Sequence, residues 1–307
     1  MTVTEAPTTT ARRGARAGRN ARRWNPHRPR KSWTLTAVMG LGLLYALFPL
    51  FWLLVNASKT ESNLFSTNGL WFGGRFALFE NVKQTLTYNG DEFLRWFGNT
   101  LIYVVAGAGG ATVLCTLGGY GLARFDFPGR RGVLAVVLGA VAIPSTVLVV
   151  PTFLMFSKIG LVDTYWSVII PSLINPFGLY LMWIFARDAI PAELLEAARV
   201  DGAREWRIFF SISLKLLRPG MVTVLLFAVV ATWNNYFLPL IMLNKSNLYP
   251  LTVGLYQWNA QSQTAGGTPI FNLVLTGSVL MIVPIMVVFL VMQRYWQSGL
   301  AAGSVKQ

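Results

Sequence analysis

The side chains that could do chemistry are concentrated in residues 187–220, a polar stretch between two apolar runs. Five of the chain's 12 acidic residues lie there, together with six basic residues. The chain's single histidine, His27, and its single cysteine, Cys115, lie elsewhere. Carboxylates and guanidinium groups beside apolar side chains suit docking into a groove on a partner, so this stretch is predicted to be a contact surface.

The polar stretch is predicted to form a helix, a sharp turn and a second helix. Pro191 suits a helix start, and residues 192–200 are good or acceptable helix formers. Gly202 follows where a left-handed turn costs little. A second helix is predicted over 203–217, up to Pro219. The first helix has an apolar, small-residue surface made of Leu194, Leu195, Ala197 and Ala198, and nearby charges come from Glu193, Glu196, Arg199 and Arg204.

The spacing in this stretch resembles the EAA loop of the membrane subunits of bacterial ABC importers. Residues 196–198 read Glu-Ala-Ala, Gly202 follows after three more residues, and Ile212 and Leu214 complete the pattern. The family usually has proline after that leucine, whereas this chain has Lys215. The alternative is an ordinary cytoplasmic loop with a solvated amphipathic helix. The resemblance implies a coupling helix that docks onto an ATPase subunit through Glu193, Glu196, Ala197, Ala198, Asp201, Gly202 and Ala203.

Composition indicates a membrane protein. The chain is 54% hydrophobic and 12% charged, with a mean hydropathy of +0.50, whereas a soluble domain has about 25% charged residues. One cysteine permits no disulfide framework and no cysteine-based zinc site. One histidine excludes histidine-dependent catalysis and multi-histidine metal sites, so neither a catalytic nor a metal site is expected.

Six apolar runs are long enough to cross the bilayer, which predicts an all-α, polytopic membrane protein. Connecting segments on the side of residues 187–220 contain 20 of the 26 basic residues. This asymmetry predicts that both termini and residues 187–220 are cytoplasmic. The predicted spans are 34–55, 100–123, 133–156, 165–186, 221–243 and 274–292.

Residues 1–32 contain nine basic residues and one acidic residue, Glu5. Such a segment buries little apolar surface, so it is predicted to be a disordered, cytoplasmic, topogenic tail. Binding to anionic lipid or nucleic acid is the alternative; no nucleic-acid partner is expected. Residues 33–307 are predicted to form the transmembrane domain.

The predicted spans contain no acidic or basic residue, although ion-coupled carriers and pumps usually place such groups at membrane depth. The chain also has no G-x-x-x-x-G-K-[ST] phosphate loop. It is therefore predicted to be a transport subunit that binds no nucleotide in that way and depends on a partner for energy.

Two polar stretches are candidates for substrate handling. In the predicted fifth span, amide and aromatic side chains suit an uncharged sugar, although they could instead bridge and pack helices. They are Trp233, Asn234, Asn235 and Tyr236. A glycine-hinged segment before the sixth span is either simply solvent-exposed or, by resemblance, a loop that contacts a binding protein. Its residues are Gln257, Trp258, Asn259, Gln261, Gly266 and Gly267.

Glycines and prolines are predicted to shape the spans. Gly118 and Gly119 should let the second span approach a neighbour closely, and Pro144 is among the prolines expected to interrupt helices. Before the second span, Phe93, Leu94, Trp96 and Phe97 suggest a helix lying at the membrane interface.

Two further segments extend the resemblance over about residues 33–307. Residues 119–131, GYGLARFDFPGRR, resemble carbohydrate-type ABC permeases, and residues 293–306, QRYWQSGLAAGSVK, resemble the subunit type represented by the maltose permease G subunit. The resemblance implies a bacterial cytoplasmic membrane protein with a second homologous permease subunit, two ATPase subunits that bind ATP and magnesium, and an extracytoplasmic sugar-binding protein. A self-contained secondary carrier and a non-transport membrane scaffold or sensor are the alternatives.

Overall fold

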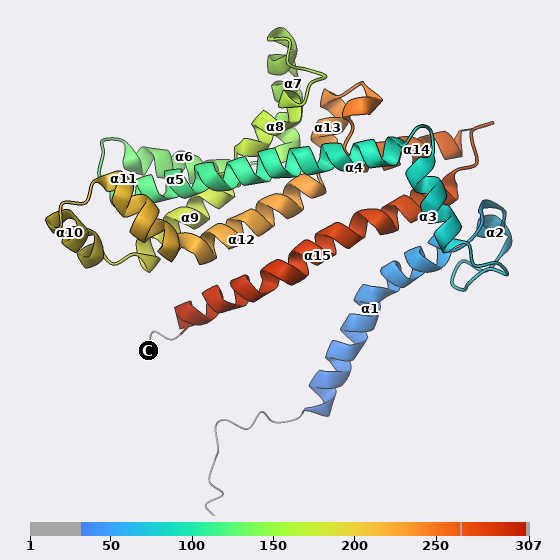
Figure 1. Cartoon of the computed structure of the whole chain (residues 1–307), viewed down its shortest axis with the longest axis horizontal. Helices are drawn as coiled ribbons and strands as arrows, with labels where there is room; N and C mark the ends of the chain where they lie inside the picture. The colour runs from blue at the N-terminus through green and yellow to red at the C-terminus, as the bar shows by residue number, and fades with distance from the viewer. Residues whose placement is uncertain (1–31, 265, 305–307) are drawn as a thin grey trace, which may run out of the picture. The chain divides into compact units, whose positions relative to one another are not determined.

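The computed structural model describes residues 32–264 and 266–304, and every regular element within these ranges is a helix (Figure 1). The chain divides into two units, one up to Phe48 and one from Pro49 onward. The described part of the first unit is the beginning of α1 (Trp33–Ala57). The predicted basic tail, residues 1–32, lies outside the described residues except for Ser32.

The second unit contains the last turns of α1 and all later elements. Up to the middle of the chain these are α2 (Glu61–Ser66), α3 (Leu78–Thr87), α4 (Glu92–Tyr103), the π-helical turn η1 (Val104–Gly109), α5 (Gly110–Arg124), α6 (Arg130–Val141), η2 (Ser145–Leu148) and α7 (Val149–Lys158). They are followed by α8 (Trp166–Leu173), α9 (Pro176–Ala189), α10 (Ala192–Val200), α11 (Glu205–Ile208), η3 (Phe209–Ser213), α12 (Leu214–Trp233), α13 (Phe237–Met242), η4 (Ser246–Leu248), α14 (Leu251–Gln263) and α15 (Phe271–Ser304).

Five helical runs in the described residues are long and apolar enough to cross a membrane, and a bent helix pair brings the number to six if it is one span. The five runs cover Trp33–Ala57, Glu92–Arg124, Trp166–Ala189, Glu205–Trp233 and Phe271–Gln293. The prediction of an all-helical, polytopic membrane protein is therefore confirmed.

The predicted span 133–156 is bent at Pro144, one of the prolines expected to interrupt a helix. Arg130–Val141 and Ser145–Lys158 meet at an angle of 99° on either side of Pro144. Proline lacks the backbone N–H that would continue the helix and disfavours helical geometry in the residue before it, so the chain turns here. As a result α6 lies along α9, while α7 leaves the bundle and packs near α13 (Figure 1).

The predicted boundaries around the fifth span are also wrong. Pro219 lies inside a continuous helical run from Glu205 to Trp233 and does not end it. Close packing accounts for this, because Leu217 is fully buried and a Cβ on Gly220 would lie 2.7 Å from the ring of Phe185 on α9. The run then stops at Trp233, before the predicted end of the span.

The second span begins earlier than predicted. α4, η1 and α5 form one run from Glu92 to Arg124, so residues 93–97 are part of this long helix. Phe93 and Trp96 are buried in a cluster with Trp258. The expectation of a separate helix lying at the membrane interface is therefore wrong, because the aromatic rings pack against α14 and α15.

A close and extensive helix contact joins α5 to α9. A Cβ on Gly119 would lie 2.6 Å from the Cβ of Met182 and 2.7 Å from the backbone nitrogen of Trp183. Gly118 is similarly close to Leu179. The predicted close approach is confirmed here, and it allows two backbones to pack as one rigid pair.

Candidate functional site

The helix predicted to contact a partner is α10, and its ends are closed as the sequence predicts. Pro191 has extended backbone geometry and precedes the first helical residue. At the other end Gly202 has φ +77°, a left-handed conformation. Its N–H donates to the carbonyl of Arg199, and the N–H of Ala203 donates to that of Ala198, both at 3.0 Å. These two bonds form a Schellman motif, which satisfies carbonyls at the helix end.

One face of α10 is buried in the chain itself. Leu195 and Ala198 belong to a cluster with Met182 and Ala186 of α9 and with Ile208 of α11. The prediction that both side chains form a partner-facing surface is therefore wrong. They are needed to attach α10 to the bundle, because a short helix is not stable alone.

The opposite face of α10 is exposed. Glu193 and Glu196 lie on it with Leu194 and Ala197, and Val200 at the end of the helix is 88% exposed. The remaining predicted docking residues, Asp201 and Gly202, are exposed in the turn, and Ala203 is half-buried.

A second exposed apolar side chain lies just beyond the turn. Trp206 of α11 is 71% exposed and stacks on Phe210. Arg199 Nε lies 2.7 Å from Glu205 Oε1, and this hydrogen bond raises the pKa of Arg199 and joins α10 to α11. Sequence reasoning missed Val200 and Trp206, although two large apolar residues among charged neighbours are a detectable signal.

Arg124 is the last residue of α5, and its side chain connects that helix to the base of this site. Its Nη2 atom lies 2.6 Å from the carbonyl oxygen of Ala186, and it also donates to the carbonyls of Arg187 and Ile190. These carbonyls lie at the end of α9 and in the segment leading to α10. One guanidinium nitrogen therefore satisfies orphan carbonyls of another helix. From the sequence, Arg124 was predicted only as one of the basic residues in a cytoplasmic loop, and nothing in its neighbours signals this role.

The predicted substrate residues lie at a break between two helices. α12 ends at Trp233, and residues 234–236 form the turn before α13. The indole of Trp233 is buried against Phe97, and its N–H has no hydrogen-bond partner in the described structure. Nonhelical backbone at membrane depth is tolerated where protein buries it or where it lines a cavity.

Both side-chain and backbone groups of the turn have local partners. Asn234 Nδ2 donates to the Val230 carbonyl, and the carbonyl of Asn235 accepts from Thr252. The Tyr236 ring packs edge to face with Tyr256 of α14. These contacts agree with the bridging alternative, while the half-buried positions of Asn235 and Tyr236 leave part of their surfaces accessible.

The predicted binding-protein segment is largely helical. Gln257, Trp258, Asn259 and Gln261 lie on α14, and Trp258 is buried against Phe93 and Trp96 with its N–H toward Glu92. A contact role for the Trp258 side chain is therefore wrong in this structure. Gln257 and Gln261 are exposed, Asn259 is half-buried, and Gly266 and Gly267 form an exposed turn in which Gly266 has φ +74°.

A carboxylate joins two loops at the end of the bundle near α13. Asp163 Oδ1 accepts from the backbone N–H groups of Asn244 and Lys245, each at 3.0 Å, and Oδ2 lies 3.2 Å from Lys245 Nζ. Burial has the largest single effect on the pKa of Asp163 and raises it, because it disfavours the charged form. The hydrogen bonds from Asn244 and Lys245, with the charge of Lys245, outweigh it and lower the pKa of Asp163.

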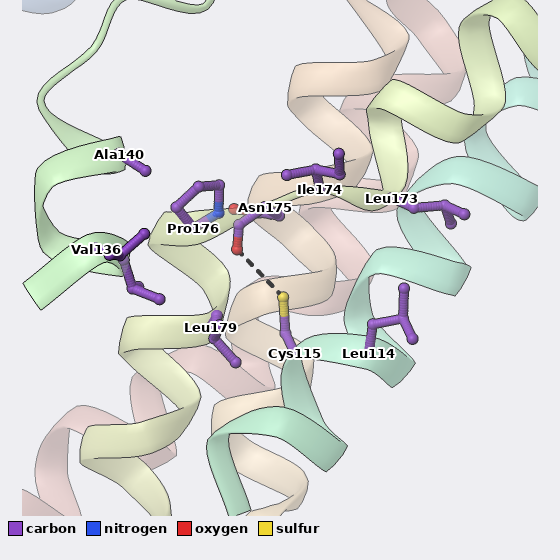
Figure 2. Close-up of a pocket in the computed structure, with 10 residues that line it drawn as sticks. Leu114, Cys115, Val136, Ala140, Leu173, Ile174, Asn175, Pro176 and Leu179 are labelled. Carbon is purple, nitrogen blue, oxygen red and sulfur yellow. Dashed lines mark hydrogen bonds between the residues drawn. The ribbon is translucent and has the colours of Figure 1, made fainter. Parts of the chain in front are cut away.

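An apolar cavity of about 310 Å³ lies at the break between α8 and α9 (Figure 2). The Cys115 thiol donates to the Asn175 carbonyl at its edge, and Leu114, Val136 and Leu179 point into the same space. It does not include the turn at residues 234–236, so this cavity is separate from the predicted substrate residues.

Residues 115–301, more than half of the chain, match the model of the binding-protein-dependent transport system inner membrane component family. The chain belongs to this family. It is therefore a permease subunit of an ABC transporter, a multi-pass protein of the bacterial cytoplasmic membrane that works with partner subunits and has no ATPase activity of its own.

Curated relatives agree with this assignment. The permease is 33% identical over 280 residues to the arabinooligosaccharides transport system permease protein AraQ of Halalkalibacterium halodurans, a match covering 91% of this chain and 98% of AraQ. It is 30% identical over 278 residues to the diacetylchitobiose uptake system permease protein NgcG of Streptomyces coelicolor, covering 88% and 86%. These matches confirm the resemblance to carbohydrate-type permeases.

A solved structure shares the fold. A chain in the crystal structure of a bacterial ABC transporter involved in the import of the acidic polysaccharide alginate matches with a TM-score of 0.73 and 22% identity. The match covers 86% of the permease and 95% of that chain.

Proposed function

We propose that the permease forms the membrane pathway of an ATP-driven importer for a sugar or oligosaccharide that an extracytoplasmic binding protein delivers. Its partners would be a second homologous permease subunit, two ATPase subunits and the binding protein. ATP and magnesium would be bound by the ATPase subunits. Relatives named for arabinooligosaccharide transport and diacetylchitobiose uptake support the substrate class.

The observation that best supports the coupling role is that one face of α10 is packed against the bundle while the other is exposed. Its inner face is packed through Leu195 and Ala198, so a force on its outer face reaches α9 and α11 without deforming the helix. The outer face presents Glu196 and exposed apolar side chains, which suit a groove on the ATPase subunit. In this orientation both termini and α10 are cytoplasmic, as the distribution of basic residues favours.

The substrate would pass the break at residues 234–236. The half-buried amide of Asn235 can donate to sugar hydroxyl groups, and the Tyr236 ring can stack on a sugar face. The buried Trp233 would support the turn from behind. At the opposite end from α10, the exposed residues Gln257 and Gln261 with the glycine turn at 266–267 would contact the binding protein.

The coupling role is tested with Glu196→Lys in the complete importer reconstituted in vesicles. Sugar uptake should fall while the variant still inserts into the membrane, because a reversed charge opposes docking of the outer face of α10. Gln84→Lys introduces the same positive charge at an exposed position of α3, at the other end of the bundle, and is the matched control.

Normal uptake by Glu196→Lys would contradict the coupling role. Copurification from detergent tests the partners independently: an ATPase subunit should accompany the wild-type chain. A self-contained carrier would transport sugar without such a subunit, and a scaffold would neither transport nor copurify with one.

A further inference from the structure

An exposed row of aromatic side chains lies between the end of α1 and the first turn of α3. We call it the aromatic strip. Adjacent rings contact one another in the pairs Trp71–Phe72, Phe72–Phe76 and Phe76–Phe79, and Phe65 packs on Phe271 at the start of α15. Its five members are Phe65, Trp71, Phe72, Phe76 and Phe79, which are between 42% and 81% exposed.

The strip is carried by a fixed loop. Lys59 is completely buried beneath it, and its Nζ atom donates to the carbonyl of Asn68 at 2.7 Å. The Asn68 side chain in turn accepts from the N–H of Leu70 at 2.9 Å. A Cβ on Gly73 would lie 3.5 Å from the Lys59 side chain. The loop therefore folds over the lysine stem and presents its aromatic rings outward.

Hydrogen bonds place this loop beside the last turns of α1. Asn56 Nδ2 donates to the carbonyls of Trp52 and Gly69, both at 2.8 Å. The chain thus doubles back along the end of the helix after leaving it. Gly69, two residues before Trp71 of the strip, consequently lies at the level of residues 52–56, which belong to a membrane span.

A polar cluster joins the ends of two spans at nearly the same level. Asn81 Nδ2 donates to the carbonyl of Ala57 at the end of α1, and Asn272 near the start of α15 donates to Asn81 Oδ1. Buried amides at the ends of two apolar helices indicate the boundary of the hydrocarbon layer. The aromatic strip lies around this boundary, at the end of the bundle opposite α10 (Figure 1).

The chemistry of the strip favours lipid over a soluble ligand. Four of its five rings are phenylalanine, which has no polar group with which to orient a sugar. Leu50, Phe51 and Leu54 on the last turns of α1 are also apolar and exposed. Phenylalanine and tryptophan side chains form the apolar face with which interfacial segments insert at the boundary between headgroups and acyl chains.

We propose that the aromatic strip is a membrane-surface site that inserts into the headgroup layer of the bilayer and fixes the height of the loop between α1 and α3. Its partner is the lipid surface itself. Arg75, which pairs with Glu80 at 2.9 Å, lies within the strip, where its charge can meet lipid phosphate. In the orientation proposed above, this is the outer leaflet.

The test uses the complete importer in phospholipid vesicles, with Cys115→Ser as background and Phe79→Cys labelled with an environment-sensitive fluorophore. Gln263→Cys, at the exposed end of α14, is the matched control. The probe at 79 should show blue-shifted emission, strong quenching by lipids brominated near the headgroup and several-fold weaker quenching by iodide than the probe at 263. Trp71→Cys, labelled in the same way, repeats the measurement at a second position.

Equal iodide quenching at 79 and 263, without lipid quenching, would overturn the proposal. Blue-shifted emission without lipid quenching would also overturn it, because the strip would then be covered by another permease subunit or by the binding protein. Measuring the importer with and without the binding protein distinguishes these two cases, since only a strip covered by the binding protein shows a blue shift that depends on its presence.

Discussion

Arg124 Nη2 lies 2.6 Å from the carbonyl oxygen of Ala186, so a side chain at the end of α5 closes the end of α9. The same nitrogen donates to Ile190, immediately before the segment that enters α10. Together with the close approach at Gly119, this contact makes α5 and α9 one unit at the base of the exposed helix. Motion of α10 would therefore reach the second span directly.

Replacing Arg124 with methionine should weaken this attachment. A hydrogen bond to a charged group contributes about 1.5–3 kcal/mol, so the detergent-solubilised permease should unfold at a lower temperature. Sugar uptake per ATP hydrolysed should also fall, because α10 would no longer be held to α5. Arg124→Lys should restore part of the unfolding temperature and part of the uptake per ATP hydrolysed, since an ammonium group can donate to several converging carbonyls.

Arg131→Met is the control for Arg124, because Arg131 is exposed on α6 nearby. The control should retain wild-type transport and thermal stability. If Arg124→Met lowered stability while leaving the ratio of uptake to ATP hydrolysis unchanged, Arg124 would be only a structural residue.

Gly202→Leu should impair assembly with the ATPase subunit. Gly202 has φ +77° with nothing within 4 Å of its Cβ position, so the cost comes from backbone strain and not from a clash. That strain is about 1–2 kcal/mol for a residue with a side chain. Copurification of the ATPase subunit measures the effect.

Gly132→Leu provides the comparison for Gly202, because Gly132 also faces open space but has ordinary helical geometry. It should leave assembly unchanged. Full copurification with Gly202→Leu would show that α10 tolerates a different C-terminal turn.

Gly119→Ala should destabilise the α5–α9 pair. The added methyl group would meet the backbone of Met182 and Trp183, which cannot move aside as a flexible side chain could. Overpacking of this kind costs about 1–3 kcal/mol, so the thermal unfolding temperature in detergent should fall. Gly121→Ala, two residues away in open space, should match the wild type. Equal stability of both variants would contradict the close approach.

The hydrogen bonds and the ion pair of Asp163 predict that the permease loses stability in acid. Because its folded-state pKa lies below the usual value of about 3.9, the stabilisation from the ionised carboxylate is present above that value and is lost as pH falls through the lower, folded-state pKa. Asp163→Asn keeps an acceptor oxygen and tolerates the positive φ of 63°, but removes the charge.

The measurement for Asp163 is the thermal unfolding temperature in detergent between about pH 5 and pH 3. The wild-type curve should fall more steeply than that of Asp163→Asn in this range. Parallel curves would mean that the carboxylate contributes no pH-dependent stability.

Sequence reasoning was most successful where local backbone chemistry decides the structure. Residues 192–200 form the predicted helix and Gly202 adopts the predicted left-handed turn, because the start and end of this helix are set by local residues, Pro191 and Gly202. The apolar runs likewise determined the membrane class. The break at Pro144 was expected from the sequence. The exact limits of the helices did not follow, because Pro219, expected to end a helix, lies inside an unbroken one.

Tertiary structure alone decided which side chains face inward. Leu195 and Trp258 are buried, Val200 and Phe79 are exposed, and Arg124 reaches the carbonyls of a distant helix. In a soluble protein an apolar stripe marks the core, but in a bilayer apolar side chains suit both the protein interior and the lipid. The sequence by itself determined that these helices cross a membrane and that a capped helix lies between two of them. Only packing, which satisfies particular backbone groups and fills particular spaces, decided how they fit together.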